Sequence, residues 1–510
     1  MTIRTRAPLI LLVPALAAAI IALVPLWYLI DQAASRGLQA VVEEIWQRRT
    51  LTLVLRSLLL TISVTSASVI VGIFCAWVVA LSGVPLRSLL LVLFSLSLAI
   101  PSYLSAFAWI SWQPQLQGFW GAFIVLTFVC YPYVMLPVAA AMRGVDPAQQ
   151  EVARSLGRSN TVVFFTVTIP QVRSAISGGS LLAALYVLSD FGAVAAMRYD
   201  VFTWVIYGAY RAGFNPSRAA VLSLVLVGIA LVLTLSEVTA RGRRAPSKLG
   251  SGAMRARRSA RVRFVPLTVG FVSLIIVGLG VGVPVVSVLS WLTRSSYRVV
   301  QWTDVFYSIV TSFQIGILTS VVAVALAVPV GIAAVRFPSR LTHTIERSTY
   351  VFHALPGIVV AISVVFVGIR LLRPIYQELP LLIIGQVIIF LPLAVASVRS
   401  ALEQSSIGVE EVARSLGVRP MKTIIRVTLP LALPGILAGG AMTMLSAIKE
   451  LPTTLLLRPT GTETLATSIW KYSTVSDYAS VAPFALALIV LAVVPVAVMS
   501  TSSITRARQL

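Results

Sequence analysis

Charged residues are scarce in this sequence. Asp, Glu, Lys and Arg together make up 11% of the 510 residues, whereas soluble domains carry about a quarter. Hydrophobic residues make up 58% of the chain, which leaves too few polar side chains to cover a soluble fold of this length. The composition therefore excludes an ordinary soluble protein and indicates an integral membrane protein.

Cysteine and histidine are also rare, with two residues of each. Cys75 and Cys130 lie in apolar segments far apart in the sequence, and His343 and His353 show no metal-ligand spacing with them. We therefore expect neither a disulfide framework nor a metal site. No loop carries a catalytic group of His, Cys or paired carboxylates, which argues against an enzyme or a signalling receptor.

The chain has no nucleotide-binding P-loop of the form G-x4-G-K-(S/T). Nothing in the sequence can therefore cradle the phosphates of ATP, and we expect the protein to bind no cofactor. If ATP drives its activity, the nucleotide must bind to a separate polypeptide.

Long apolar runs dominate the rest of the chain. A membrane-spanning helix needs about 20 apolar residues, whereas a membrane barrel would show alternating segments of about ten. The first run is longer than the apolar core of a signal peptide, so we expect it to be a retained span. The runs predict an all-α polytopic membrane protein with about twelve transmembrane helices, near residues 8–30, 52–81, 87–111, 119–142, 174–196, 218–240, 265–292, 307–335, 346–371, 380–399, 432–457 and 479–503.

Basic residues exceed acidic ones by 40 to 17. In a membrane protein this excess reflects the accumulation of Lys and Arg in cytoplasmic loops, so it does not indicate nucleic acid as a partner. The most basic stretch, 241–263, is expected to be a disordered cytoplasmic linker that also meets lipid headgroups. With a cytoplasmic N-terminus most basic residues fall in cytoplasmic loops, and the C-terminus is then cytoplasmic too.

An internal repeat divides the chain into two homologous halves, 1–240 and 264–510. The seven residues EVARSLG occur at 151–157 and again at 411–417, each followed by a proline after the same spacing. Other pairs align as well, namely Pro101 with Pro356, Pro132 with Pro392 and Asp190 with Glu450. Because each half has an even number of predicted spans, the halves insert the same way up, as a parallel repeat.

Each copy of the repeat predicts a short helix outside the membrane. In the first copy Asp146 is suited to the N-cap and Gly157 to a left-handed stop, which predicts a helix over 147–156. Ser406 and Gly417 play these parts in the second copy. Such a helix rises only about 15 Å, so it cannot span a bilayer. It offers a small apolar ridge, formed by Val152 and Leu156 in the first copy and by Val412 and Leu416 in the second.

These loops resemble the EAA loop of ABC importer permeases, which reads EAA, three residues, Gly, nine residues, Ile, any residue, Leu-Pro. The chain departs from it by apolar exchanges alone, such as Val152 and Val412 for the first Ala. In that family the loop is a coupling helix, and we call 146–170 and 406–430 the first and second coupling loops. The resemblance implies two ATPase subunits at the cytoplasmic face, a substrate-binding protein at the outer face, and a bacterial inner-membrane location. It also implies ATPase-contacting positions at Glu151, Ala153, Gly157, Glu411, Ala413 and Gly417.

Three ionisable residues within predicted spans, in the outer half of the bilayer, are candidates for the substrate pathway: Asp190, Lys449 and Glu450. A charge inside the bilayer is costly, so each marks a possible site. The two acids could line a pathway for a cationic substrate. Alternatively they could be neutralised in structural pairs, with Lys449 beside Glu450 and Arg198 approaching Asp190.

The whole chain resembles the fused two-half permeases of ferric-iron importers, most clearly from Ser189 and from Lys449 onward. The resemblance implies import of ferric iron by alternating access, with thiamine, phosphonate or a polyamine as alternative substrates for the same architecture. An ion-coupled carrier with twelve helices is the alternative class. Its usual loop signal, G-x3-D-R-x-G-R-R, is absent at the expected position, 82–88.

Overall fold

The computed structural model describes residues 8–35, 37–84, 86–211, 215–241, 267–294, 301–351 and 355–509. Within these ranges the regular secondary structure is helical and contains no strand. Helices satisfy all backbone polar groups within the segment, which the bilayer interior demands. The predicted all-α fold is confirmed, while the basic linker from residue 242 onward lies outside the described residues.

The helices of the described ranges match the predicted spans. Nine are long and apolar enough to cross a membrane, and a bent pair, Arg87–Leu98 with Ser102–Trp112, makes a tenth candidate. Two shorter apolar helices, Gly357–Arg370 and Tyr478–Val493, stand where the ninth and twelfth spans were predicted. Each predicted apolar run therefore corresponds to helical structure.

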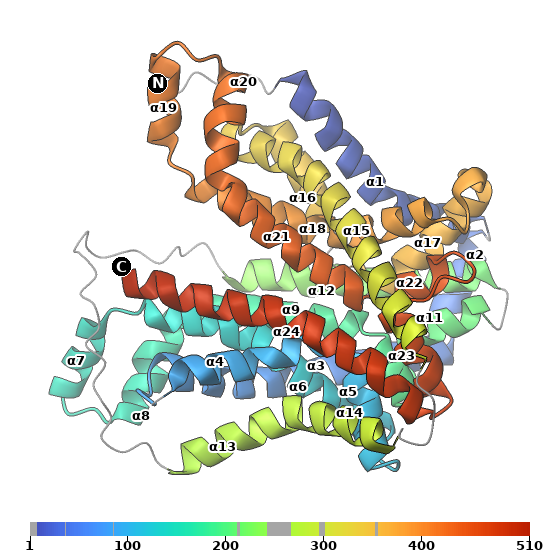
Figure 1. Cartoon of the computed structure of the whole chain (residues 1–510), viewed down its shortest axis with the longest axis horizontal. Helices are drawn as coiled ribbons and strands as arrows, with labels where there is room; N and C mark the ends of the chain where they lie inside the picture. Colours follow the sequence, from blue (N-terminus) through green and yellow to red (C-terminus); the bar gives the residue numbers. More distant parts are fainter. Residues whose placement is uncertain are drawn as a thin grey trace. The chain divides into compact units, whose positions relative to one another are not determined.

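The helices form two compact units (Figure 1). Unit 1 holds helices from both ends of the first half and most of the second half. Its helices are α1 (Leu9–Ala34), α2 (Leu38–Trp46), most of α11 (Phe202–Arg211), the start of α12 (Pro216–Arg241), α15 (Trp302–Arg336), α16 (Arg340–Val351), α17 (Gly357–Arg370), η6 (Arg373–Ile375), α18 (Leu379–Gln404), α19 (Ile407–Ser415), α20 (Pro420–Thr423), η7 (Ile424–Thr428), α21 (Leu429–Lys449), α22 (Pro452–Leu457) and most of α23 (Leu465–Thr474).

Unit 2 holds most of the first half together with helices from the second. Its helices are α3 (Arg48–Ala80), α4 (Arg87–Ser95), η1 (Leu96–Leu98), α5 (Ser102–Trp112), α6 (Gly118–Arg143), α7 (Pro147–Ser155), α8 (Asn160–Val163), η2 (Phe164–Thr168), α9 (Ile169–Ser189), α10 (Gly192–Ala196), the end of α12, α13 (Leu267–Val277), η3 (Gly278–Gly282), α14 (Val283–Arg294) and α24 (Tyr478–Gln509).

The units therefore do not follow the two sequence halves. In unit 1, α1 of the first half packs on α15, α16 and α17 of the second, where Tyr28 stacks on Phe366 with ring centroids 5.2 Å apart. In unit 2, α14 of the second half packs on α5 of the first, and α24 packs on α4. Each half thus contributes helices to the core of the other.

The centre of each unit is a group of three mutually packed helices: α3, α6 and α9 in unit 2, and α15, α18 and α21 in unit 1. Equivalent glycines allow the last helix of each group to approach its neighbour. A Cβ at Gly179 would lie 2.8 Å from Val134 Cα on α6, and one at Gly439 would lie 2.3 Å from Ser397 Cβ on α18. A side chain at either position would push the helices apart, because protein interiors are closely packed.

Four predicted spans differ in the structure. The span predicted at 87–111 bends by 91° at Pro101, and the one predicted at 346–371 is divided into α16 and α17, with Pro356 before α17. Proline lacks an N–H and disfavours helical geometry in the preceding residue, so a continuous helix is not maintained there. The spans predicted at 174–196 and 432–457 instead begin within the coupling loops and end at Ser189 and Lys449.

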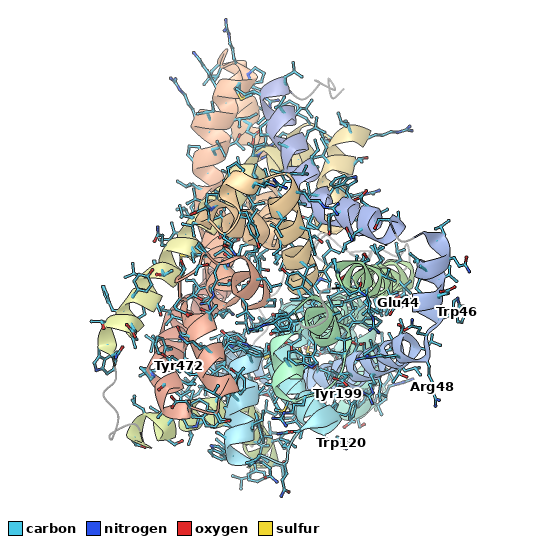
Figure 2. The ribbon with its side chains drawn as sticks, turned by 90° about the vertical axis from the view of Figure 1, so that its right-hand side faces the viewer. Glu44, Trp46, Arg48, Trp120, Tyr199 and Tyr472 are labelled. Carbon is cyan, nitrogen blue, oxygen red and sulfur yellow. The ribbon has the colours of Figure 1, made fainter. Side chains whose placement is uncertain are left out.

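Aromatic side chains gather at the start of α6 in unit 2. Phe119 contacts Trp120 and Tyr199 edge to face, with ring centroids 5.3 and 5.8 Å away, and Trp120 and Tyr199 are marked in Figure 2. The Gly118 N–H donates to the Met197 carbonyl at 2.7 Å, which joins this end of α6 to the end of α10. Tyr and Trp are enriched where a membrane meets water, so we expect this group to lie near one boundary of the span.

Candidate coupling helices and intramembrane carboxylates

The two coupling loops form nearly identical helices, α7 and α19. The Asp146 side chain accepts a hydrogen bond from the Ala148 N–H at 2.9 Å, so the predicted N-cap of α7 is confirmed. Ser406 occupies the N-cap position of α19, but its side chain makes no capping bond. The predicted N-cap position of Ser406 is therefore confirmed, but the capping hydrogen bond expected from its side chain is absent.

Both helices end at a glycine in the left-handed region, as predicted. Gly157 has φ of 79° and Gly417 has φ of 80°. The Gly157 N–H donates to the Arg154 carbonyl, and the next N–H reaches the Ala153 carbonyl; Gly417 makes the equivalent bond to Arg414. This geometry satisfies the last carbonyls of each helix and costs glycine little.

The predicted apolar ridge is exposed on both helices. Val152 and Leu156 are 59% and 75% exposed, and Val412 and Leu416 are 60% and 78% exposed. Glu151 and Glu411 are exposed beside the ridge, and Ala153 and Ala413 are half-buried. The predicted contact residues are thus at least partly accessible on each loop, and their ATPase-contacting role stays a prediction.

A buried ion pair anchors α19, and the sequence analysis did not identify it. Arg336, at the end of α15, lies 2.7 Å from the Glu410 carboxylate, and both side chains are at most 7% exposed. The Arg336 guanidinium also donates to the Leu402 carbonyl at 3.0 Å and to the Ser405 hydroxyl at 2.5 Å. The second coupling helix is therefore tied to α15 and α18 through a charged network.

The first coupling helix uses a neutral anchor instead. Gln150 stands where Glu410 stands in the repeat, is buried, and donates to the Thr168 hydroxyl at 3.2 Å. Thr168 lies in η2, directly before α9. The equivalent hydroxyl, that of Thr428, is buried and has no hydrogen-bond partner within the described part of the chain. The two loops are thus alike in their exposed surface and different in their attachment.

Each coupling loop leads into the core through one turn of π-helix. In η2 the Ile169 N–H donates to the Phe164 carbonyl, and in η7 the Leu429 N–H donates to the Ile424 carbonyl. Such wide turns inside helices occur frequently at functional sites. Helices α9 and α21 start immediately after them, so each runs from one coupling loop to the residue before Asp190 or Glu450.

Asp190 stands at the break between α9 and α10. One carboxylate oxygen accepts from the Ala193 N–H at 2.9 Å and the Val194 N–H at 3.3 Å. The other accepts from the Ser102 hydroxyl, on the first residue of α5. Asp190 is buried, and these donors meet the requirement that a buried charge be hydrogen-bonded.

Glu450 stands at the equivalent break between α21 and α22. Its carboxylate accepts from the Thr453 N–H at 2.8 Å and from the Thr454 N–H at 3.0 Å. The Thr454 hydroxyl lies 3.1 Å from the second oxygen. Both acids therefore accept N–H groups from the first turn of a short helix, a role that neither the pathway interpretation nor the ion-pair interpretation anticipated.

Lys449 is the last residue of α21 and is half-buried beside Glu450. No group of three His, Cys, Asp or Glu side chains in the described ranges could hold a metal ion. The pathway role of Asp190, Lys449 and Glu450 stays a prediction, because the bonds above explain both carboxylates without a substrate.

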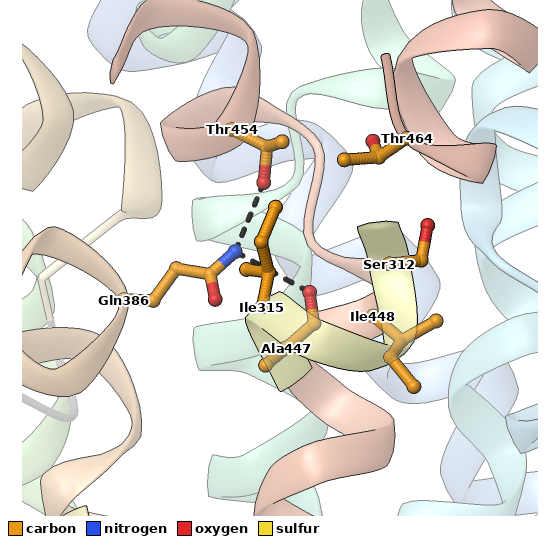
Figure 3. Close-up of a pocket in the computed structure, with 7 residues that line it drawn as sticks. All are labelled: Ser312, Ile315, Gln386, Ala447, Ile448, Thr454 and Thr464. Atoms are coloured by element: carbon orange, nitrogen blue, oxygen red, sulfur yellow. Dashed lines mark hydrogen bonds between the residues drawn. The ribbon is translucent and has the colours of Figure 1, made fainter. Parts of the chain in front are cut away.

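A buried glutamine extends the environment of Glu450. Gln386 on α18 accepts from the Thr319 hydroxyl at 2.8 Å. Its side-chain amide donates to the Thr454 hydroxyl at 3.0 Å and to the Ala447 carbonyl at 3.4 Å (Figure 3). The small pocket beside it has no room for a water molecule. This region holds four helices together and offers no space for a substrate.

Comparison with known proteins assigns the family. The family model of the binding-protein-dependent transport system inner membrane component matches residues 68–241 and 327–502, so each match includes one coupling loop. The chain is 35% identical to the Fe(3+)-transport system permease protein FbpB 2 of Haemophilus influenzae, over 92% of this chain and 94% of that protein.

Other relatives cover less of the chain. The sulfate transport system permease protein CysW of Escherichia coli is 26% identical over 36% of this chain and 68% of its own length. The spermidine/putrescine transport system permease protein PotC of Haemophilus influenzae is 24% identical over 24% of this chain and 49% of its own length. With the family model matched in both halves, the chain belongs to the family of inner-membrane components of binding-protein-dependent transport systems.

Proposed function

We propose that this chain is the membrane subunit of an ATP-driven importer that carries ferric iron, delivered by an external binding protein, into the cytoplasm. The observation that carries the substrate assignment is the 35% identity with the ferric-iron permease, which extends over 92% of this chain. The sulfate and polyamine permeases match only 36% and 24% of it. An identity that extends over 92% of the chain, and so into both halves, supports ferric iron over those substrates.

The energy source in this proposal is a pair of ATPase subunits that dock on α7 and α19. Each helix exposes an apolar ridge, and its small residues, such as Ala153 and Gly157, permit close approach of a partner. Exposed apolar groups rimmed by charge mark interaction surfaces. The matching ridges favour two copies of the same partner.

Reconstitution into proteoliposomes tests the substrate and the energy source together. The permease is combined with its ATPase and with its binding protein loaded with radioactive ferric iron. We expect iron uptake that requires ATP and stops with ADP. Labelled sulfate and labelled spermidine serve as matched substrates. Uptake of either one in place of iron would overturn the substrate assignment, and iron uptake without ATP would indicate an ion-coupled carrier.

A further inference from the structure

The two residues that carry the intramembrane carboxylates have nearly the same backbone conformation. Asp190 has φ of −64° and ψ of 130°, and Glu450 has φ of −69° and ψ of 128°. Each accepts N–H groups from the residues three and four positions later. The side chains nevertheless differ in length by one methylene, so their surroundings must differ to hold both carboxylates in place.

The residue that faces each carboxylate compensates for this difference. Pro101 and Pro356 have nearly the same conformation and precede Ser102 and Gly357, the first residues of α5 and α17. The Ser102 hydroxyl donates to the shorter acid, Asp190. A Cβ at Gly357 would lie 3.1 Å from the Glu450 carboxylate, so a side chain fits at this position only if that carboxylate shifts.

The hydroxyl group missing at Gly357 is present on the opposite helix. Thr453, on α22, donates from its side chain to the Gly357 carbonyl at 3.3 Å. The equivalent residue of the first half is Ala193, which has no hydroxyl. In both halves one hydroxyl therefore links the helix after the proline to the helix break. In the first half Ser102, on the helix after the proline, supplies it, and in the second half Thr453, on the helix after the break, supplies it.

We propose that Asp190 with Ser102, and Glu450 with Gly357 and Thr453, form two matched locks that fasten the helix leaving each coupling loop to the helix that follows Pro101 or Pro356. These are positioning residues, and the carboxylates act on protein donors. A displacement of α7 or α19 then reaches α5 or α17 through α9 or α21, because each of these helices begins at a coupling loop and ends at a lock. The proposal rests on the proposed function only in using ATP-driven uptake as its measurement.

Exchanging the two sets of residues tests the locks. Gly357→Ser and Glu450→Asp are made separately and together, and the double variant gives the second half the residue pair of the first. We expect each single substitution to lower uptake about ten-fold and the double variant to recover to within about two-fold of wild type. Multiplication of the two single losses in the double variant would overturn the proposal.

The first half supplies the matched control. Ser102→Ala removes the hydroxyl that Asp190 accepts from, whereas Ser105→Ala removes a buried hydroxyl of the same helix that has no partner within the described residues. We expect uptake to fall with the first substitution and to remain near wild type with the second. Equal uptake in the two variants would contradict the lock.

Thermal unfolding of the purified variants covers the case in which a variant folds poorly. We expect the melting temperature to fall in each single variant and to return toward the wild-type value in the double variant. A melting temperature of the double variant that does not recover would overturn the proposal independently of transport. Absence of ATP-driven uptake in the wild type itself would instead reject the proposed function, so the two failures are distinguishable.

Discussion

The conformation of the chain favours glycine at positions 157 and 417, because φ is 79° at one and 80° at the other. The chain itself imposes no steric requirement there, since a Cβ at either position would find no atom within 4 Å. A side chain that tolerates the left-handed conformation should therefore be harmful only if an external partner approaches closely.

Substitution of both glycines separates the conformational requirement of the chain from a steric requirement set by a partner. Asn accepts the left-handed region, whereas a β-branched Val pays about 1–2 kcal/mol for it. For Gly157→Asn with Gly417→Asn we expect a melting temperature near wild type and a loss of ATPase stimulation in reconstituted complexes. The Val pair should lose stimulation and also melt lower. Normal stimulation in the Asn pair would show that no partner approaches these positions closely.

At the scale of elements, the two coupling helices share a surface and differ in attachment. Helix α19 is held by the Arg336–Glu410 ion pair, and α7 by the neutral Gln150–Thr168 bond. The repeat in the sequence predicts the shared surface, because the same letters build it twice. It does not predict the anchors, since Arg336 is distant in sequence and its partner becomes apparent only when α15 and α19 are placed together.

Removal of each anchor should have unequal consequences. Glu410→Ala leaves Arg336 buried without its carboxylate, which costs about 3–5 kcal/mol, whereas Gln150→Ala loses a neutral bond of about 1 kcal/mol. We expect a clearly lower melting temperature for Glu410→Ala than for Gln150→Ala in detergent. The combination Arg336→Leu with Glu410→Leu should recover part of the loss. Equal melting temperatures for the two alanine variants would contradict this account.

The close packing of α21 on α18 gives a second prediction at this scale. Gly439→Leu places a side chain where even a Cβ would lie 2.3 Å from Ser397, and overpacking of this kind costs about 1–3 kcal/mol or more. We expect a strong loss of folded protein after purification. The control is Gly270→Leu on α13, where a Cβ meets nothing within 4 Å. Similar yields for both variants would mean that α21 does not pack on α18 as described.

The whole molecule shows how helices of one sequence half complete the core of the other. Apolar runs predict where helices lie, because about 20 apolar residues are needed for each span. They do not predict that α1 packs on α15 and α17, since a lipid-facing and a protein-facing helix have similar hydropathy. The same limit applies to the locks. The sequence identifies Asp190 and Glu450 as ionisable residues within spans, but it does not predict that Ser102 and Gly357 lie against them, because those contacts join residues far apart in the chain.

This exchange of helices predicts how the chain behaves when it is divided. Two separate polypeptides, 1–250 and 251–510, should associate stably when expressed together, because α1 packs on helices of the second half and α14 on a helix of the first. We expect a tag on one polypeptide to retain the other through purification in detergent. A version of the first polypeptide without α1 and α2 should be retained less. Full separation of the intact pair would contradict the exchange.

Cross-linking from the coupling helices tests the central claim, that α7 and α19 are the docking sites of the ATPase, most directly. A cysteine is introduced at Ala153 or Ala413 and joined to a photoreactive maleimide reagent; the native Cys75 and Cys130 are buried and should not react. A cysteine at Gln39 on α2 serves as the control, because Gln39 follows the first predicted span and, with the expected cytoplasmic N-terminus, lies on the opposite side of the membrane. The account predicts cross-links to the ATPase from both coupling helices and none from Gln39. An ATPase cross-link from neither helix, in a complex that transports normally, would contradict it.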